Sequence, residues 1–324
     1  MPSVVAVVGM LSIALTGCSP APAEGAGNKG LQVVATTTQV ADFTRNVVGQ
    51  ATGVHVTQLI QPNQSVHSYD PSAADLTALA RADVLIENGL GLEEWLDDSV
   101  TASGFSGKII HSAVGIDVLH DDGGDDGEAG HHAGNPHVWT DAANAEIMVH
   151  NITAGLSAAD PGKAELFGAN ADRYEADLRA LDAWIRADVA QVPRSQRLLV
   201  SNHDALGYFT AAYGITYVGS VIPSFDDNAE PSAAEIDRLV AAIRKTGAKA
   251  VFSEASVNPK AAETISREAG VTVYSGDDAL YVDSLGPAGS AGATYVAAQV
   301  HNVRRITTSW GATPLPLPER LGDL

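Results

Sequence analysis

Three histidines and one aspartate stand where their side chains could bind a divalent metal ion: His67, His137, His203 and Asp283. Imidazole nitrogens combined with one carboxylate oxygen suit zinc in a four-coordinate arrangement. The residues are separated by 70, 66 and 80 positions, unlike the compact ligand pairs of zinc fingers. Spacing alone therefore leaves another interpretation open, in which each histidine is a hydrogen-bonded structural residue and Asp283 caps a turn.

An acidic, glycine-rich segment precedes His137. Residues 120–135 contain too few apolar side chains to offset the entropy of ordering, so we expect this loop to be mobile. Its ionisable side chains could collect Zn²⁺ weakly and raise the metal concentration near a tighter site. The alternative is a merely solvated acidic insertion. The side chains concerned are His120, Asp121, Asp122, Asp125, Asp126, Glu128, His131 and His132.

The elements around these residues predict an α/β fold with two lobes. We expect each lobe to hold a four-stranded, mainly parallel sheet flanked by helices. Ligands bind beyond the carboxyl ends of strands in such sheets, and His67, His203 and Asp283 follow the second, fifth and eighth predicted strands. The predicted strands are residues 31–36, 54–60, 83–87, 108–111, 197–200, 215–218, 248–253 and 271–274.

Residues 160–192 predict one long helix between the lobes. Asp160 and Pro161 are typical of a helix start, apolar residues then recur at helical spacing, and Pro193 marks the end. The N-terminal lobe is therefore assigned to residues 31–159 and the C-terminal lobe to residues 193–324. A continuous helix is stiffer than a loop and limits hinging between lobes.

The first 18 residues predict a lipoprotein signal peptide. Their apolar stretch, positions 4–15, is too short to cross a bilayer, and it ends in Leu15-Thr16-Gly17-Cys18, which resembles the bacterial lipobox. No Lys or Arg precedes the stretch, a departure from the usual signal. We expect an exported protein, anchored to the outer face of the cell membrane by lipid at Cys18 through a flexible tether, residues 19–30.

Composition restricts the ligand further. The chain has 39 acidic and 19 basic residues, a formal charge of −20, which repels nucleic acid and favours a cation. Cys18 is the sole cysteine, so a metal site in the folded part must use nitrogen and oxygen ligands.

Several motifs resemble those of the metal-binding solute receptors of ABC-type importers, the zinc and manganese lipoprotein family. The likeness covers nearly the whole mature chain and is carried by residues 35–38, 135–139, 201–209 and 283–286. It implies two lobes joined by a long helix, and it implies that His67, His137, His203 and Asp283 are the metal ligands. A histidine at the third ligand position accompanies zinc in that family and a glutamate accompanies manganese, so His203 favours Zn²⁺, with Mn²⁺ as the alternative.

The expected function is capture of Zn²⁺ between the lobes and delivery to an ABC-type permease with its ATPase. A zinc-delivering metallochaperone is a further candidate partner, and we expect a monomer. A surface adhesin or metal-storage lipoprotein would use the same fold. A zinc hydrolase is disfavoured because four protein ligands leave no open position for water, so no enzyme is expected. For release we expect the Asp283 segment to open, since it is rich in glycine up to Gly292.

Overall fold

The first lobe of the computed structural model is built on one parallel sheet. The structure describes residues 1, 3–4, 30–120, 134–227 and 229–322. The strand order is β2-β1-β3-β4, and the central strand β1 pairs with both β2 and β3. Their bounds are β1 Leu31–Ala35, β2 Val54–Gln58, β3 Val84–Glu87 and β4 Lys108–His111. The four predicted strands are thus confirmed, shortened by one or two residues at some ends.

Four helices accompany this sheet. Their bounds are α1 Thr38–Val48, α2 Ala73–Arg81, α3 Leu96–Ser103 and α4 Ala142–Ala159. Helix α1 begins directly after β1 because the Thr37 hydroxyl accepts a hydrogen bond from the Val40 N–H, which satisfies a free donor of the first turn. Helix α2 begins with a reciprocal capping box between Ser72 and Asp75. These starts fix the loops at the carboxyl edge of the sheet.

The second lobe contains the four expected strands. They form two two-stranded sheets and not the single four-stranded sheet that the sequence predicts. Among the described residues, β5 pairs with β6 and β7 pairs with β8, both in parallel, and β5 lies beside β7. The bounds are β5 Leu198–His203, β6 Thr216–Ile222, β7 Ala250–Phe252 and β8 Thr272–Tyr274. The helices are α6 Gly207–Tyr213, α7 Ala233–Thr246, α8 Lys260–Ala269, α9 Tyr295–Ser309 and α10 Glu319–Gly322.

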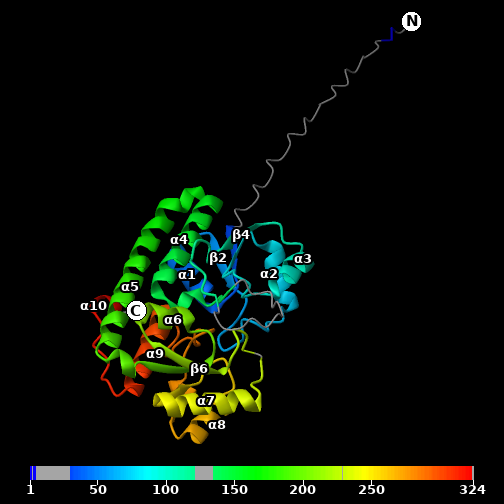
Figure 1. Ribbon diagram of the computed structural model, residues 1–324. Helices are drawn as coiled ribbons and strands as arrows, with labels where there is room; N and C mark the ends of the chain where they lie inside the picture. Colours follow the sequence, from blue (N-terminus) through cyan, green and yellow to red (C-terminus); the bar gives the residue numbers. More distant parts are fainter. Residues whose placement is uncertain (2, 5–29, 121–133, 228, 323–324) are drawn as a thin grey trace.

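One long helix, α5 Ala164–Ala190, runs along both lobes (Figure 1). It packs on α1 and α4 of the first lobe and on α9 of the second. It starts four residues later than predicted, because a 3₁₀ turn, Pro161–Lys163, comes first and the Asp160 side chain pairs with Lys163 instead of capping the helix. None of the described helices has the length and apolar character needed to span a membrane.

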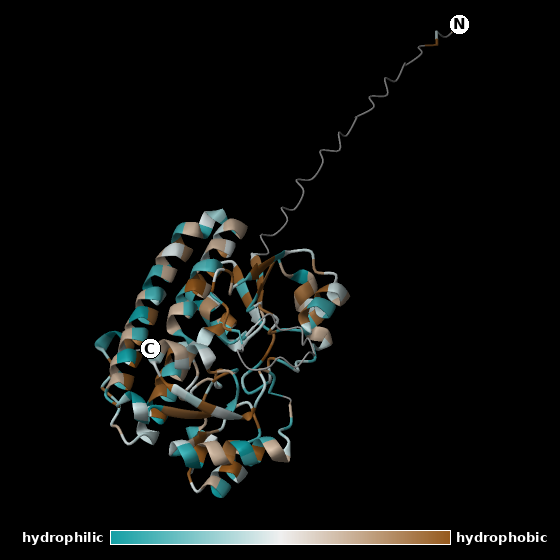
Figure 2. Cartoon of the chain, viewed as in Figure 1, coloured by the Kyte–Doolittle hydropathy of each residue, from teal (hydrophilic) through white to brown (hydrophobic). Residues whose placement is uncertain are grey.

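The largest apolar cluster extends through both lobes. It joins Phe43 of α1, Leu178 of α5 and Phe209 of α6 with the α9 residue Tyr295, all of them buried. Figure 2 shows brown, hydrophobic strands inside and teal, hydrophilic turns on the outward faces of the helices. Smaller clusters lie within each lobe. Because the main core is shared, the lobes are held together by apolar burial as well as by the chain.

Candidate metal site

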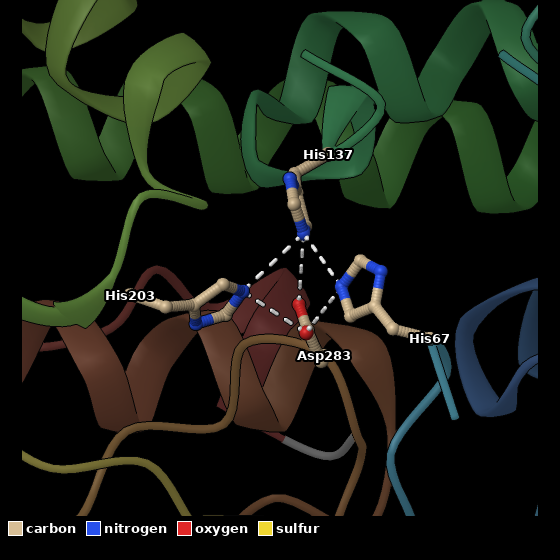
Figure 3. A group of neighbouring side chains, drawn as sticks. All are labelled: His67, His137, His203 and Asp283. Atoms are coloured by element: carbon tan, nitrogen blue, oxygen red, sulfur yellow. Dashed lines mark hydrogen bonds and ion pairs between the residues drawn. The ribbon is translucent and has the colours of Figure 1, made fainter. Parts of the chain in front are cut away.

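The four predicted ligands lie together between the lobes (Figure 3). One ligand atom from each of His67, His137, His203 and Asp283 lies within 4.8 Å of the others. The Asp283 carboxylate is central: its Oδ2 is 3.2 Å from His67 Nε2 and 3.1 Å from His203 Nε2, and its Oδ1 is 3.4 Å from His137 Nε2. His137 Nε2 lies 3.3 Å from Nε2 of both other histidines.

Each ligand comes from a different element. His67 lies in the loop between β2 and α2, and His137 precedes the short 3₁₀ helix Val138–Thr140. His203 is the last residue of β5, not a residue beyond the strand as predicted. Asp283 lies after β8, three residues beyond Leu280, which forms an isolated parallel bridge with Glu254. The first lobe thus supplies two of the candidate ligands and the second lobe two.

The site is closed to solvent on nearly all sides. The side chains of His137, His203 and Asp283 are fully buried, whereas that of His67 is 5% exposed. The ring of Phe225 lies 6.4 Å from the ring of His137. His67 therefore marks the side of the site nearest to solvent.

Two of the histidines are oriented by neighbouring side-chain oxygens. Asn135 Oδ1 accepts hydrogen bonds from the ring Nδ1 of His137 (2.8 Å) and from its backbone N–H (3.0 Å). Glu254 Oε1 accepts in the same way from the ring Nδ1 of His203 (2.7 Å) and from its backbone N–H (3.2 Å). Because Nδ1 in both rings donates to a side-chain oxygen, Nε2 is the nitrogen that faces the centre and would bind a metal ion once it has lost any proton it carries.

The electrostatics of the site favour positive charge. Burial alone would raise the pKa of Asp283, but the adjacent His203 and His137 hold it well below its ordinary value. Burial alone would lower the pKa of His203, but Asp283 and Glu254 raise it well above its ordinary value. The cluster therefore holds an anionic carboxylate at its centre, ready to pair with a cation.

The segment around Asp283 is bound to the first lobe. The Val282 carbonyl accepts hydrogen bonds from Gln39 Nε2 (2.8 Å) and Trp139 Nε1 (3.0 Å). On the other side, Leu285 N–H donates to Thr38 Oγ1 (2.9 Å), and Ser284 Oγ accepts from the Asn63 N–H (2.8 Å).

Two of the glycines that follow Asp283 serve close packing. A Cβ on Gly292 would lie 2.4 Å from the Tyr281 ring, and one on Gly286 would lie 2.1 Å from Ser290 Oγ. Packing therefore explains Gly286 and Gly292, whereas Gly289 has a φ of 84° and open space around it. The opening of this segment on release stays a prediction.

The structure describes only one of the predicted metal-binding residues of the acidic loop. His120 is exposed and lies at the end of the described part of its loop. Asp121, Asp122, Asp125, Asp126, Glu128, His131 and His132 lie outside the described residues, as does Cys18. The sequence alone did not indicate that Asn135 and Glu254 orient the histidines. Glu254 stands two residues after β7, so the rule that led to His203 and Asp283 could have found it.

A two-lobed α/β protein with buried imidazoles and a carboxylate gathered between its lobes belongs to the class of receptors that enclose a metal ion. Residues 33–309 match the family described as zinc-uptake complex component A, periplasmic. The chain belongs to this family of metal-binding solute-binding proteins of ABC importers. It is a receptor for transport and not an enzyme, as the sequence predicts.

Relatives and solved structures cover almost the whole chain. It is 32% identical over 304 residues to the manganese-binding lipoprotein MntA of Halalkalibacterium halodurans, covering 92% of this chain and 94% of that protein. It is 33% identical over 305 residues to the protein of the same name from Bacillus subtilis, covering 93% and 97%. The periplasmic zinc-binding protein TroA from Treponema pallidum superimposes with a TM-score of 0.78 at 28% identity, covering 87% of this chain and 99% of that one.

Proposed function

We propose that this protein captures one divalent transition-metal ion with His67, His137, His203 and Asp283 and presents it to an ABC-type permease coupled to an ATPase. One observation carries the ligand assignment. A tetrahedron with metal–ligand bonds of about 2.0–2.1 Å has edges of about 3.3 Å. Five distances between the four side chains fall between 3.1 and 3.4 Å. Asp283 approaches His137 through Oδ1 and the other two histidines through Oδ2, and one atom from each side chain lies within 4.8 Å of the others. These spacings support a small four-coordinate ion.

Zinc is the cargo that the donor chemistry favours. Three imidazole nitrogens and one carboxylate oxygen suit Zn²⁺, whereas Mn²⁺ is better served by carboxylate, carbonyl and water oxygens. His203 is the deciding residue, since it supplies a third nitrogen. The names of the two MntA relatives favour manganese as the second candidate.

A competition experiment separates the two cargoes. Protein purified without added metal is examined by elemental analysis, stripped with chelator and titrated with Zn²⁺ and Mn²⁺ separately by calorimetry. We expect zinc in the purified protein and tighter binding of Zn²⁺ at one tight site. Manganese in the purified protein together with tighter Mn²⁺ binding would reverse the assignment of cargo, and binding of neither ion would end the proposal.

We also propose how the protein is exported and anchored. We propose that residues 1–18 are removed as a signal peptide, that lipid at Cys18 anchors the protein outside the membrane, and that residues 19–30 tether the lobes of residues 31–159 and 193–324 to that anchor. The names of the relatives, which are lipoproteins, support this location. The protein would act as a monomer and could receive zinc from a metallochaperone.

A further inference from the structure

Glu254 orients His203 with a carboxylate, whereas Asn135 orients His137 with a neutral amide. Both side-chain oxygens accept one bond from ring Nδ1 and one from the backbone N–H of the same histidine. The geometry is thus nearly the same at His137 and His203. The difference is that only His203 is paired with a carboxylate.

The backbone around Glu254 also supports the segment that leads to Asp283. Glu254 forms a parallel bridge with Leu280, the Ala255 N–H donates to the Leu280 carbonyl (2.9 Å), and the Leu280 N–H donates to the Ser253 carbonyl (2.9 Å). Asp283 follows three residues later. Glu254 therefore contacts His203 with its side chain, and its bridge partner Leu280 stands three residues before Asp283.

The charge of Glu254 is placed where a cation would offset it. Glu254 is 2% exposed and Asp283 is fully buried, so two carboxylates lie in the same water-free region. A buried charge is costly unless it is paired, and two carboxylates balance one divalent ion. Glu254 Oε2 has no hydrogen-bond partner within the described part of the chain, so protein donors do not fully neutralise the group.

We propose that Glu254 is a positioning residue that fixes the tautomer of His203 and supplies the second negative charge needed for tight zinc binding. A carboxylate that accepts the Nδ1 proton orients the ring and strengthens Nε2 as a metal donor. This inference rests on the proposed function and names the group that sets the affinity of its site.

The test compares Glu254→Gln with Glu263→Gln. Both substitutions remove one negative charge from the second lobe, but Glu263 is exposed on α8. Circular dichroism checks folding, and the zinc dissociation constant is measured by competition with a chelator at neutral pH. We expect Glu254→Gln to weaken zinc binding by about 10- to 100-fold. Glu263→Gln should bind zinc as the wild type does.

A spectroscopic measurement distinguishes positioning from general damage. In zinc-loaded wild type, imidazole NMR should show His203 with a proton on Nδ1 and metal on Nε2, and that proton should resonate far downfield because of the carboxylate. In Glu254→Gln the resonance should move upfield. If the variant does not fold, the wild-type spectrum alone tests the inference. A His203 ring without a proton on Nδ1 in zinc-loaded wild type overturns it.

The outcomes separate the two proposals. Zinc binding by the wild type with less than a tenfold loss in Glu254→Gln overturns the role of Glu254 and leaves the proposed function intact. Failure of the wild type and of Glu263→Gln to bind zinc overturns both.

Discussion

His203 contributes the third nitrogen to the site, and its removal tests the ligand assignment most directly. The side chain is fully buried and touches both Asp283 and Glu254. A ligand that binds only the folded state stabilises it by about 4 kcal/mol at a free concentration about 1,000 times its dissociation constant. Each kcal/mol raises the melting temperature of a protein of this size by roughly 1.5–2 °C.

We therefore expect zinc to raise the melting temperature of the wild type by roughly 6–8 °C. His203→Ala should abolish most of that rise, as followed by calorimetric melting with and without Zn²⁺. His55→Ala is the matched control, because His55 is exposed on β2 and should leave the rise unchanged. An undiminished rise in His203→Ala would contradict the assignment.

The four candidate metal ligands could be predicted from the sequence, but the side chains that orient them could not. His67, His137, His203 and Asp283 were found from their motifs, and the structure brings all four together. That Glu254 holds His203 depends on contact between residues 51 positions apart. No local pattern encodes that distance, although the position of Glu254 after a buried strand was a signal.

Among the elements, the acidic loop has ends that are fixed to the folded part. The Asn135 N–H donates to the Leu119 carbonyl (2.8 Å), and the Leu119 N–H donates to the hydroxyl of Tyr208 in the second lobe (3.0 Å). Tyr208 also donates from its hydroxyl to the Asn135 carbonyl (2.9 Å). The loop therefore starts and ends beside the residue that orients His137.

Replacing residues 121–132 by a short glycine linker should leave tight zinc binding intact, because the joined ends already lie side by side. If the loop collects zinc, the replacement should slow metal loading and remove a second, weak binding event, as measured by stopped-flow mixing and calorimetry. A loop of the same length with its acids and histidines changed to serine is the control for length. One binding event with the same rate in all three proteins would leave only a solvated insertion.

The strands show where local pattern reaches its limit. Residues 108–111 were predicted at their observed bounds, because the β-branched pair Ile109 and Ile110 forms the centre of this short run. Strand β5 was predicted to end at Val200 but continues through Ser201 and Asn202 to His203. Polar residues lower strand propensity in isolation, yet tertiary contacts bury these three. Propensity therefore placed His203 outside the strand that in fact positions it.

At the scale of the whole molecule, Asp42 ties the first lobe to the connecting helix and to the second lobe. Its carboxylate accepts hydrogen bonds from the Tyr174 hydroxyl of α5 and the Tyr295 N–H of α9, each at 3.2 Å. Burial raises the pKa of Asp42 to about 6 despite these bonds. In the unfolded chain the pKa of the same carboxyl stays near its ordinary value of about 4.

A carboxyl whose pKa is higher in the folded state stabilises the fold below its unfolded pKa, and this contribution is lost as pH rises through the folded pKa. Relative to Asp42→Asn, the wild type should therefore lose about 2 kcal/mol of unfolding free energy between pH 4 and pH 7. Denaturant unfolding of both metal-free proteins in chelator measures this difference. Parallel pH curves for the two proteins would show that Asp42 keeps an ordinary pKa when folded.

The long helix α5 and the apolar core on which it lies make a wide clam-shell swing costly, because such a motion would expose buried surface in both halves at once. We expect the loaded and empty receptors to present nearly the same outline to the importer. The transporter would then sense occupancy through the order of the short loops that carry His67 and Asp283, rather than through the angle between two bodies.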